Sequence, residues 1–319
     1  MEAKTALIAM SGGVDSSVAA YLMLQAGFRC LGVNMRLYHN EDIGISIFKS
    51  CCSQEDREDA AAVAERLGMP FEVKDFTADF RREVIDKFIR TYEQGGTPNP
   101  CIDCNRCLKF ARLLDFAGEK GLKYLVTGHY AQVEYEKESG RYLLRKARDL
   151  TKDQSYVLYN LTQEQLARTR FPLGELAGGK EETRRIAEKL GLSNAHKRES
   201  QDICFVPDGD YVGFMERYSG KRYGEGDFLD REGQKIGWHR GAVHYTIGQR
   251  RGLGLAAAQP LYVCGKDMGA NTVTVGRESD LYARELYATD LNWIALPELS
   301  GPLPVLAKTR YRQDRKSVV

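Results

Sequence analysis

Three cysteines recur at intervals of three residues near the middle of the sequence. They are Cys101, Cys104 and Cys107, in the segment TPNPCIDCNRC. This spacing brings thiolates together on a helical turn or in a tight loop, and a C-x2-C-x2-C run resembles a local segment of iron–sulfur ligation. A zinc site would need a fourth ligand from elsewhere in the chain. Cys107 opens an apolar helical segment, so for this residue a buried packing role is the stronger interpretation.

A further cysteine, Cys204, lies far downstream in the segment ESQDICFVPDGDY. A lone cysteine between Ile203 and Phe205 is more often buried than reactive. Two separated thiols near a nucleotide site nevertheless suggest sulfur chemistry. One thiolate carries a persulfide and attacks an activated carbon, and the second thiol resolves the product.

The motif SGGVDSS, residues 11–17, lies between a predicted strand and a predicted helix. Its two glycines let the backbone approach an anion closely, the amides of the helix N-terminus point at that anion, and the serine hydroxyls add donors. The motif therefore predicts a phosphate-binding loop. It lacks the lysine of a Walker A loop, which disfavours an NTPase that transfers the γ-phosphate. A Gly-Ser helix cap without a ligand is the alternative.

Composition limits the class of protein that carries these residues. A length of 319 residues, with 43% apolar and 28% charged residues, indicates a globular protein of two or three domains. No apolar run approaches the ~18 residues that span a bilayer, and the N-terminus does not resemble a signal peptide. We therefore expect a cytoplasmic protein without a membrane partner. Eight cysteines in that compartment favour metal binding or catalysis over structural disulfides.

The first half of the chain alternates predicted strands and helices. We expect strands at residues 4–10, 30–38, 71–76 and 124–135, and helices at residues 16–27, 54–68, 79–96 and 109–120. The segment TPNP is expected to break the structure before residue 101. This alternation predicts an open, mostly parallel sheet with helices on both faces, whose ligands lie at the carboxyl ends of the strands. Residues 163–191 are expected to be helical, and Gly-rich short strands begin near residue 207.

Eight segments in series resemble one known family. They are SGGVDSS, CCSQEDREDA, TPNPCIDCN, TGHYA, KDQSYVLY, ESQDICFVP, HYTIGQRRGLG and LYVCGKD. In this order they resemble the tRNA-specific 2-thiouridylases (the MnmA/TrmU family), and the resemblance covers essentially the whole chain. It implies an α/β PP-loop catalytic domain of the adenine nucleotide α-hydrolase-like type at residues 1–206. It also implies a small central β-rich tRNA-binding domain at residues 207–270 and a short or truncated C-terminal β-barrel at residues 271–319.

The resemblance implies ATP-dependent transfer of sulfur to C2 of the wobble uridine, position 34, of the Lys, Glu and Gln tRNAs. The reaction passes through an adenylated uridine and releases AMP and pyrophosphate. ATP and Mg²⁺ are the implied cofactors. A cysteine desulfurase, a relay protein or free sulfide is the implied sulfur donor.

The family pattern also implies roles for individual residues. ATP-binding residues are Ala9, Met10, Ser11, Gly12, Gly13, Val14, Asp15, Ser16, Met35 and Gly128, with Asp15 near Mg²⁺. Residues that border the target base, flipped out of the anticodon stack, are Asn99, Pro100 and Cys101. Residues that contact tRNA are His129, Lys152, Asp153, Gln154, Arg310 and Tyr311. The catalytic pair is Cys104 and Cys204.

Two mechanisms are compatible with this pattern. In the first, a persulfide on Cys204 delivers sulfur and Cys104 resolves it through a transient disulfide. In the second, Cys101, Cys104 and Cys204 hold a [4Fe–4S] cluster. Many family members have Asp at the position of Cys101, so a thiol here adds a third soft ligand and favours the cluster. Cys107 departs from the usual pattern and is either a substitute ligand or a core residue.

Basic segments are local, because 46 basic and 44 acidic residues leave a formal charge of only +2. Residues 141–152, 239–251 and 308–316 are net positive and interleave Tyr and His, which suits contact with a tRNA backbone and its bases. Solvated surface is the alternative interpretation for each segment. Cys51 and Cys52 are expected to pack at a helix entry, and Gln201 and Asp202 to position the Cys204 loop.

Two other functions remain open at this point. Another PP-loop ligase or amidotransferase would explain SGGVDSS but leave the cysteines without a role. A metal-containing RNA-binding module, with iron–sulfur or zinc, would explain the cysteines but leave the phosphate loop without one.

Overall fold

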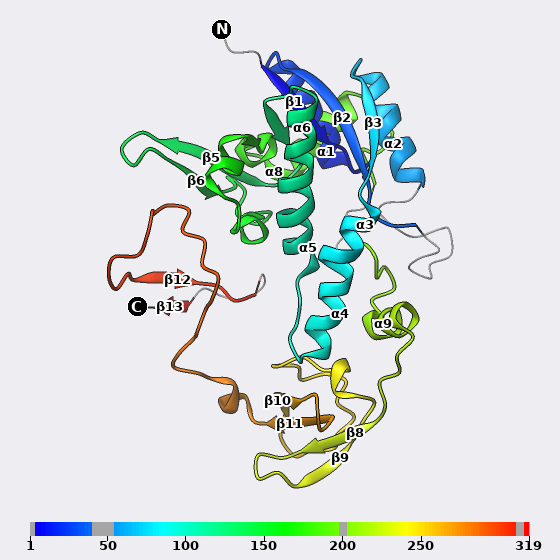
Figure 1. The fold of residues 1–319 in the computed structure, drawn as a ribbon, viewed down its shortest axis with the longest axis vertical. Helices are drawn as coiled ribbons and strands as arrows, with labels where there is room; N and C mark the ends of the chain where they lie inside the picture. Colours follow the sequence, from blue (N-terminus) through cyan, green and yellow to red (C-terminus); the bar gives the residue numbers. More distant parts are fainter. Residues whose placement is uncertain (1–3, 40–53, 198–202, 311–315, 319) are drawn as a thin grey trace.

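The computed structural model describes residues 4–39, 54–197, 203–310 and 316–318 (Figure 1). An α/β region formed by the first two hundred or so residues occupies one end of the molecule, and a smaller β unit occupies the other. Long helical rods that include α4 (Asp86–Glu93) and α6 (Leu113–Glu119) extend from the α/β region toward the β unit (Figure 1).

Five parallel strands form the main sheet. They are β1 (Thr5–Ala9), β2 (Arg29–Arg36), β3 (Phe71–Asp75), β4 (Tyr124–Val126) and β7 (Thr169–Arg170). Their order is β3-β2-β1-β4-β7, and every neighbouring pair is parallel. The predicted parallel sheet is confirmed. The two-residue strand β7 lies in a stretch expected to be helical, and it is too short to show a strand pattern in the sequence.

Helices cover both faces of this sheet, as the sequence predicted. Successive side chains of a strand point to opposite faces, and Leu7 packs into one core while Ala6 and Ile8 pack into another. The first core includes α4 and α6. The second includes α1 (Val14–Gln25), α2 (Gln54–Arg66) and α8 (Gly179–Lys189). Covering both faces of a parallel sheet in this way leaves its carboxyl edge for ligands.

A helix expected at residues 109–120 begins earlier than the sequence indicated. It runs through α5 (Pro100–Asp103), a π-helical segment η2 (Cys104–Arg112) and α6. Pro100 occupies the first helical turn, where its missing N–H costs nothing. The expected break at TPNP is confirmed, because α4 ends at Glu93 and residues 96–99 lie in no helix or strand, but Pro100 itself begins the next helix. A second rod of the same kind joins α3 (Thr77–Phe80), the π segment η1 (Arg81–Ile85) and α4.

The single strand expected at residues 124–135 is two strands in different sheets. After β4 the chain leaves the parallel sheet, and β5 (Ala131–Glu136) pairs antiparallel with β6 (Arg141–Lys146). The region expected to be helical between 163 and 191 also contains short elements. These are α7 (Gln163–Ala167) and η4 (Pro172–Glu175), which lead to α8, and η3 (Ser155–Leu158) precedes them.

The small β unit has a sheet and a core of its own. Its strands β8 (Gly226–Leu229), β9 (Lys235–His239), β10 (Tyr262–Asp267) and β11 (Thr272–Gly276) lie in the order β10-β11-β8-β9. Phe228, Val263 and Val273 are at the centre of its core. Strands β10 and β11 pair as a hairpin, so the sheet continues to Gly276. A domain boundary after residue 270, as expected from the sequence, would cut this hairpin. Helix α9 (Tyr211–Ser219) packs instead on the first core.

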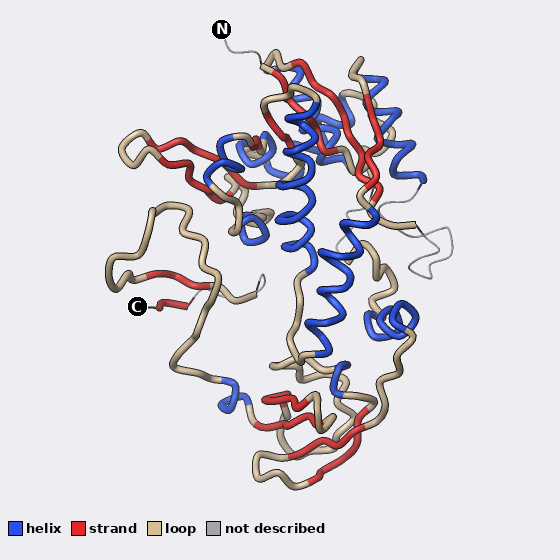
Figure 2. The backbone as a smooth tube through the Cα atoms, in the orientation of Figure 1, coloured by secondary structure: helices blue, strands red, loops and turns tan. Residues whose placement is uncertain are grey.

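The last part of the chain has little regular structure (Figure 2). In the described ranges, β11 is followed only by η6 (Glu278–Leu281), β12 (Val305–Ala307) and β13 (Lys316–Val318). The short helix η5 (Ala242–His244) lies earlier, within the β unit. Strands β12 and β13 form a two-stranded antiparallel ladder. That ladder stands where a short or truncated barrel was expected. No helix among the described residues is long and apolar enough to cross a membrane.

Candidate functional site

The phosphate-binding loop lies where the sequence placed it, between β1 and α1 at the carboxyl edge of the sheet. The Met10 amide donates to the carbonyl of Val33 at 2.8 Å, and Asn34 Nδ2 donates to the Met10 carbonyl at 2.8 Å. The Ser16 and Ser17 hydroxyls each donate to the Gly13 carbonyl at 3.0 Å. These bonds fix the loop, and the first amides of α1, which have no partner within the helix, are suited to an anion.

Two glycines of the predicted ATP site stand where a side chain does not fit. Gly12 has φ +78°, and a Cβ there would lie 2.3 Å from the carbonyl oxygen of Asp56. A Cβ at Gly128 would lie 2.8 Å from the Ser16 nitrogen. Gly128, just after the end of β4, therefore lies directly against the start of α1.

The remaining predicted ATP residues occupy the same edge. Ala9 is the last residue of β1, Met35 lies near the end of the neighbouring strand β2, and Val14 is the first residue of α1. Ser11 is exposed, whereas Met10 is buried. The carboxyl ends of adjacent parallel strands thus gather the whole predicted set.

Asp15, predicted to lie near Mg²⁺, is held by partners that the sequence analysis missed. Lys180 Nζ donates to both carboxylate oxygens, at 2.8 and 2.7 Å, and the Tyr130 hydroxyl donates at 2.7 Å. The Lys180 side chain is 7% exposed and that of Asp15 is 29% exposed. A carboxylate is a usual Mg²⁺ ligand, and the exposed part of Asp15 leaves room for that role. Tyr130 lies in the TGHYA motif, two residues after Gly128, whereas Lys180 lies in none of the motifs that the sequence analysis identified.

A buried asparagine also clamps the loop and was missed. Asn194 follows α8, is 2% exposed, and donates through Nδ2 to the Gly12 carbonyl and to Ser17 Oγ, both at 2.9 Å. Three residues later, Lys197 makes ion pairs with Asp56 and Asp59 at 2.7 and 2.5 Å. The segment that leads toward Cys204 is therefore anchored to the phosphate loop and to α2.

The cysteines of the middle segment lie on one helical rod but differ in exposure. Cys101 is exposed, Cys104 is buried at 8% exposure, and Cys107 is intermediate. Asn99 is the residue before α5, partly exposed and without a side-chain capping bond, and Pro100 is buried. The three residues predicted to border the target base therefore form the beginning of this rod.

The backbone at Cys204 is anchored on both sides while its thiol stays partly exposed. The Tyr38 hydroxyl donates to the Cys204 carbonyl at 2.8 Å. Phe205 is 1% exposed and packs edge-on against Phe80 and Phe88, with ring centroids 5.6 and 5.2 Å away. Cys104 belongs to the core that Phe205 and Cys204 pack against. The fold thus brings both members of the predicted catalytic pair to the same core.

The predicted [4Fe–4S] ligand set is not formed. Within the ranges that the structure describes, no three His, Cys, Asp or Glu side chains come together as a metal-binding group. Cys101 and Cys104 differ in exposure, and the wider π-helical turn that begins at Cys104 alters the helical spacing. Burial, with Glu83 and Asp103 nearby, raises the pKa of the Cys107 thiol, which favours its reading as a packing residue. No disulfide joins two described cysteines.

His129 is packed as a neutral ring. Its Nδ1 lies 2.7 Å from the Thr127 hydroxyl, and Phe110 and Phe171 lie with their ring centroids 5.9 Å from it. Burial, aided by the nearby Lys109 ammonium, holds the pKa of His129 well below 6.5. A contact with tRNA would therefore use stacking or a neutral hydrogen bond and not a positive charge.

Replacing His129 by glutamine is expected to flatten the pH dependence of stability. Because the pKa of His129 is lowered in the folded state, the imidazole binds a proton below pH 6.5 in the unfolded chain but stays neutral in the folded protein. Wild type should lose up to about 1.4 kcal/mol of unfolding free energy per pH unit from this group as the pH falls below 6.5. Urea unfolding at pH 7.5, 6.5 and 5.5 measures the loss. The same pH slope in wild type and His129→Gln would contradict this explanation of His129.

The predicted tRNA residues of the KDQ segment have mixed roles. Gln154 exchanges hydrogen bonds with the Tyr130 backbone, at 2.8 and 3.0 Å, and Asp153 accepts from the Ala147 amide at 3.0 Å. Both side chains thus brace the loop beside Tyr130. Arg310 donates to the Ile247 carbonyl at 2.9 Å, which ties the C-terminal segment to the β unit. Tyr311, Gln201, Asp202, Cys51 and Cys52 lie outside the described residues.

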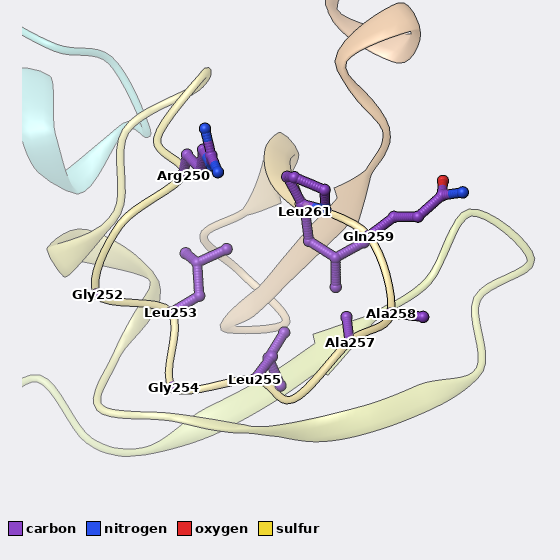
Figure 3. Close-up of a pocket in the computed structure, with 10 residues that line it drawn as sticks. Arg250, Gly252, Leu253, Gly254, Leu255, Ala257, Ala258, Gln259 and Leu261 are labelled. Carbon is purple, nitrogen blue, oxygen red and sulfur yellow. The ribbon is translucent and has the colours of Figure 1, made fainter.

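Two hollows accompany these segments. One, of about 420 Å³, lies between the hairpin region and the C-terminal segment and is lined by Leu144, Lys146, Leu150, Asp153, Ser155, Tyr156, Tyr159, Ile294 and Lys308. The other, of about 430 Å³, is enclosed by the loop from Arg250 to Leu261, with Arg250 and Gln259 on opposite sides (Figure 3). The first adjoins the KDQ segment, and the second includes Arg250 of the basic segment 239–251.

Comparison with known proteins gives matches over nearly the whole chain. Residues 4–208 match the family model of the tRNA methyl transferase HUP domain, and residues 212–277 match that of the tRNA methyl transferase PRC-barrel domain. The chain is 46% identical over 308 residues to the tRNA-specific 2-thiouridylase MnmA of Clostridioides difficile strain 630, covering 97% of this chain and 84% of that protein.

A second relative and a solved structure extend the comparison. The chain is 48% identical over 306 residues to the MnmA of Moorella thermoacetica, covering 96% of this chain and 85% of that protein. Among solved structures, the U34-tRNA thiolase NcsA of Methanococcus maripaludis, with its [4Fe–4S] cluster, matches with a TM-score of 0.42 and 18% identity. That match covers 69% of this chain and 65% of the other.

Proposed function

Because the chain belongs to the family of tRNA-specific 2-thiouridylases, we propose that it transfers sulfur to C2 of uridine 34 in the Lys, Glu and Gln tRNAs. The reaction uses ATP and passes through an adenylated uridine. One observation carries this proposal: the fold anchors the predicted ATP loop, through Asn194, to the segment that leads to Cys204, and it brings Cys204 and Cys104 to one core.

The phosphate loop would bind the triphosphate of ATP. Backbone amides at the start of α1 and in the glycine loop before it supply donors, and the loop contains no lysine. Mg²⁺, held with the help of Asp15, would screen the phosphates when bound. The uridine C2 oxygen attacks the α-phosphorus, pyrophosphate leaves, and C2 becomes an electrophile with AMP as its leaving group.

Sulfur transfer then follows the persulfide route. The terminal sulfur of a Cys204 persulfide attacks C2, and AMP departs with the former C2 oxygen. The Cys104 thiolate attacks Cys204 Sγ, which releases the 2-thiouridine and forms a Cys104–Cys204 disulfide. An external dithiol reduces this disulfide, and the persulfide of a cysteine desulfurase or a relay protein then transfers its terminal sulfur to the Cys204 thiol. Free sulfide would instead attack Cys204 Sγ in the Cys104–Cys204 disulfide, which forms the Cys204 persulfide and releases the Cys104 thiolate. This route requires no iron–sulfur cluster, and the described cysteines form no ready-made ligand set for one.

The hollow beside the KDQ segment supports binding of tRNA. Lys146 and Lys308 line it with Tyr156 and Tyr159, which combines cations for phosphates with rings on which bases stack. The Tyr156 hydroxyl donates to the Thr309 carbonyl at 3.0 Å, so the C-terminal segment forms one wall. The two predicted tRNA-contact segments, Lys152–Gln154 and the residues before Tyr311, therefore meet at one surface.

Conversion of ATP to AMP and pyrophosphate should depend on tRNA. The uridine oxygen is the nucleophile, so without tRNA the adenylation has no acceptor. Incubation of the protein with ATP, Mg²⁺ and unmodified tRNA Lys, followed by chromatography of the nucleotides, measures this dependence. We expect AMP release at least roughly a hundredfold faster with tRNA than without it.

The same assay distinguishes the proposed function from the two alternatives, a PP-loop ligase or amidotransferase and an RNA-binding module. A ligase or amidotransferase that activates a small metabolite would form AMP with that metabolite and ignore tRNA. An RNA-binding module would bind tRNA and form no AMP. A transcript with cytidine in place of uridine 34 is the matched control, and AMP release with that transcript would contradict the proposed acceptor.

A further inference from the structure

Lys180 is a buried cation that pairs with Asp15 beside the phosphate loop, and it takes part in none of the proposed chemical steps. Lys180, in the first turn of α8, is 6% exposed. A lysine so deeply buried is rare unless it is paired. Its ammonium lies 2.7 and 2.8 Å from the two oxygens of Asp15, which belongs to the first turn of α1.

The surrounding bonds hold Lys180 toward Asp15. The Asp149 carboxylate accepts a hydrogen bond from the Lys180 backbone amide and thereby fixes the beginning of α8. The Thr183 hydroxyl donates to the Gly179 carbonyl at 3.1 Å and lies 3.0 Å from the Tyr130 hydroxyl, which itself donates to Asp15. Asp15 therefore accepts hydrogen bonds both from α8, through Lys180, and from the turn after β4, through Tyr130.

The position of Asp15 creates an electrostatic difficulty. The start of α1 suits an anion, but a carboxylate in the same turn repels one. An unpaired Asp15 would therefore oppose the binding of a triphosphate that carries about four negative charges. A cation paired with both of its oxygens removes this opposition, and Lys180 is placed to supply that charge.

We propose that Lys180 is a positioning residue of the ATP site, whose ammonium neutralises Asp15 so that the loop and the start of α1 accept the triphosphate. The inference rests on the proposed use of ATP. Lys180 acts through Asp15, and its contribution is electrostatic. Removing the carboxylate should therefore make the ammonium unnecessary for nucleotide binding.

Calorimetric titration with the ATP analogue AMP-PNP in EDTA tests this charge relation without turnover. Lys180→Met should weaken binding at least roughly tenfold, because Asp15 then faces the phosphates unpaired. The double variant Asp15→Asn/Lys180→Met should bind within about threefold of wild type. Lys189→Met, which removes an exposed lysine from the end of α8, is the matched control and should bind as wild type does.

Binding by Lys180→Met within threefold of wild type would overturn the proposal, and so would a folded double variant that binds as weakly as Lys180→Met. If Lys180→Met does not fold, as melting by circular dichroism would reveal, Asp15→Asn alone decides. It should bind Mg²⁺-free AMP-PNP at least as tightly as wild type, and a tenfold loss would overturn the proposal. Wild type that binds no nucleotide even when Mg²⁺ replaces EDTA would refute the proposed function instead.

Discussion

Replacement of Cys204 by serine is expected to lower the formation of 2-thiouridine by roughly a thousandfold or more, with tRNA binding unchanged. A hydroxyl cannot carry the persulfide, so the sulfur that attacks C2 is missing from the site. The substitution removes no large apolar surface, and the anchors of this segment, Phe205 and the Tyr38 bond to the Cys204 carbonyl, remain. Thiouridine in digested tRNA, quantified by mass spectrometry, and filter binding of labelled tRNA are the two measurements.

Other cysteines provide the controls for this experiment. Cys104→Ser should allow sulfur to reach C2 but block release of the product, so a covalent protein–tRNA adduct should accumulate. Cys264→Ser, in β10 of the separate β unit, should leave thiolation within about twofold of wild type. Persistent thiolation by Cys204→Ser would show that another group carries the sulfur.

Replacement of Gly12 by alanine is expected to abolish ATP turnover, with a loss of roughly a hundredfold or more. The new Cβ would stand 2.3 Å from the Asp56 carbonyl oxygen, in a backbone conformation, φ +78°, that L residues rarely adopt. The loop must shift away from α2, and displacement of positioning groups by even an ångström costs about 10²-fold. AMP release in the presence of tRNA measures the effect.

A glycine away from the site separates strain from displacement. Gly27 has nearly the same backbone angle, φ +79°, but nothing lies within 4 Å of its Cβ position. Gly27→Ala should cost about 1 kcal/mol of stability and leave ATP turnover unchanged. Equal losses of ATP turnover in both variants would contradict this explanation of Gly12.

The parts of the site that are formed by neighbouring residues in the sequence were predictable from local patterns. The loop between β1 and α1 follows from glycines and serines placed between a strand pattern and a helix pattern. The partners of Asp15 were not predictable, because Lys180 lies 165 residues away in the sequence and only the packing of α8 on α1 brings it close. Asn194 reaches Gly12 across 182 residues for the same reason.

The helical rod formed by α5, η2 and α6, which carries Cys101, Cys104 and Cys107, shows why local patterns did not predict its start or its cysteine arrangement. The segment TPNP does interrupt the helices, but its last residue, Pro100, begins the next helix. Proline is favourable at the first turn of a helix, and only the surrounding structure distinguishes that position from a break. The π-helical turn from Cys104 to Arg112 has no sequence signature. A spacing of three residues therefore suggested converging thiols, whereas the structure leaves Cys101 exposed and buries Cys104.

The most direct measurement of the central claim is the position and identity of the sulfur in the product tRNA. Unmodified tRNA Lys, Glu and Gln transcripts are incubated with the protein, ATP, Mg²⁺, a reductant and sulfide or a persulfide donor, then digested and sequenced by mass spectrometry. The account predicts 2-thiouridine at position 34 of each, formed with one AMP per sulfur. Thiolation at another position, or AMP formed without sulfur incorporation, would contradict it.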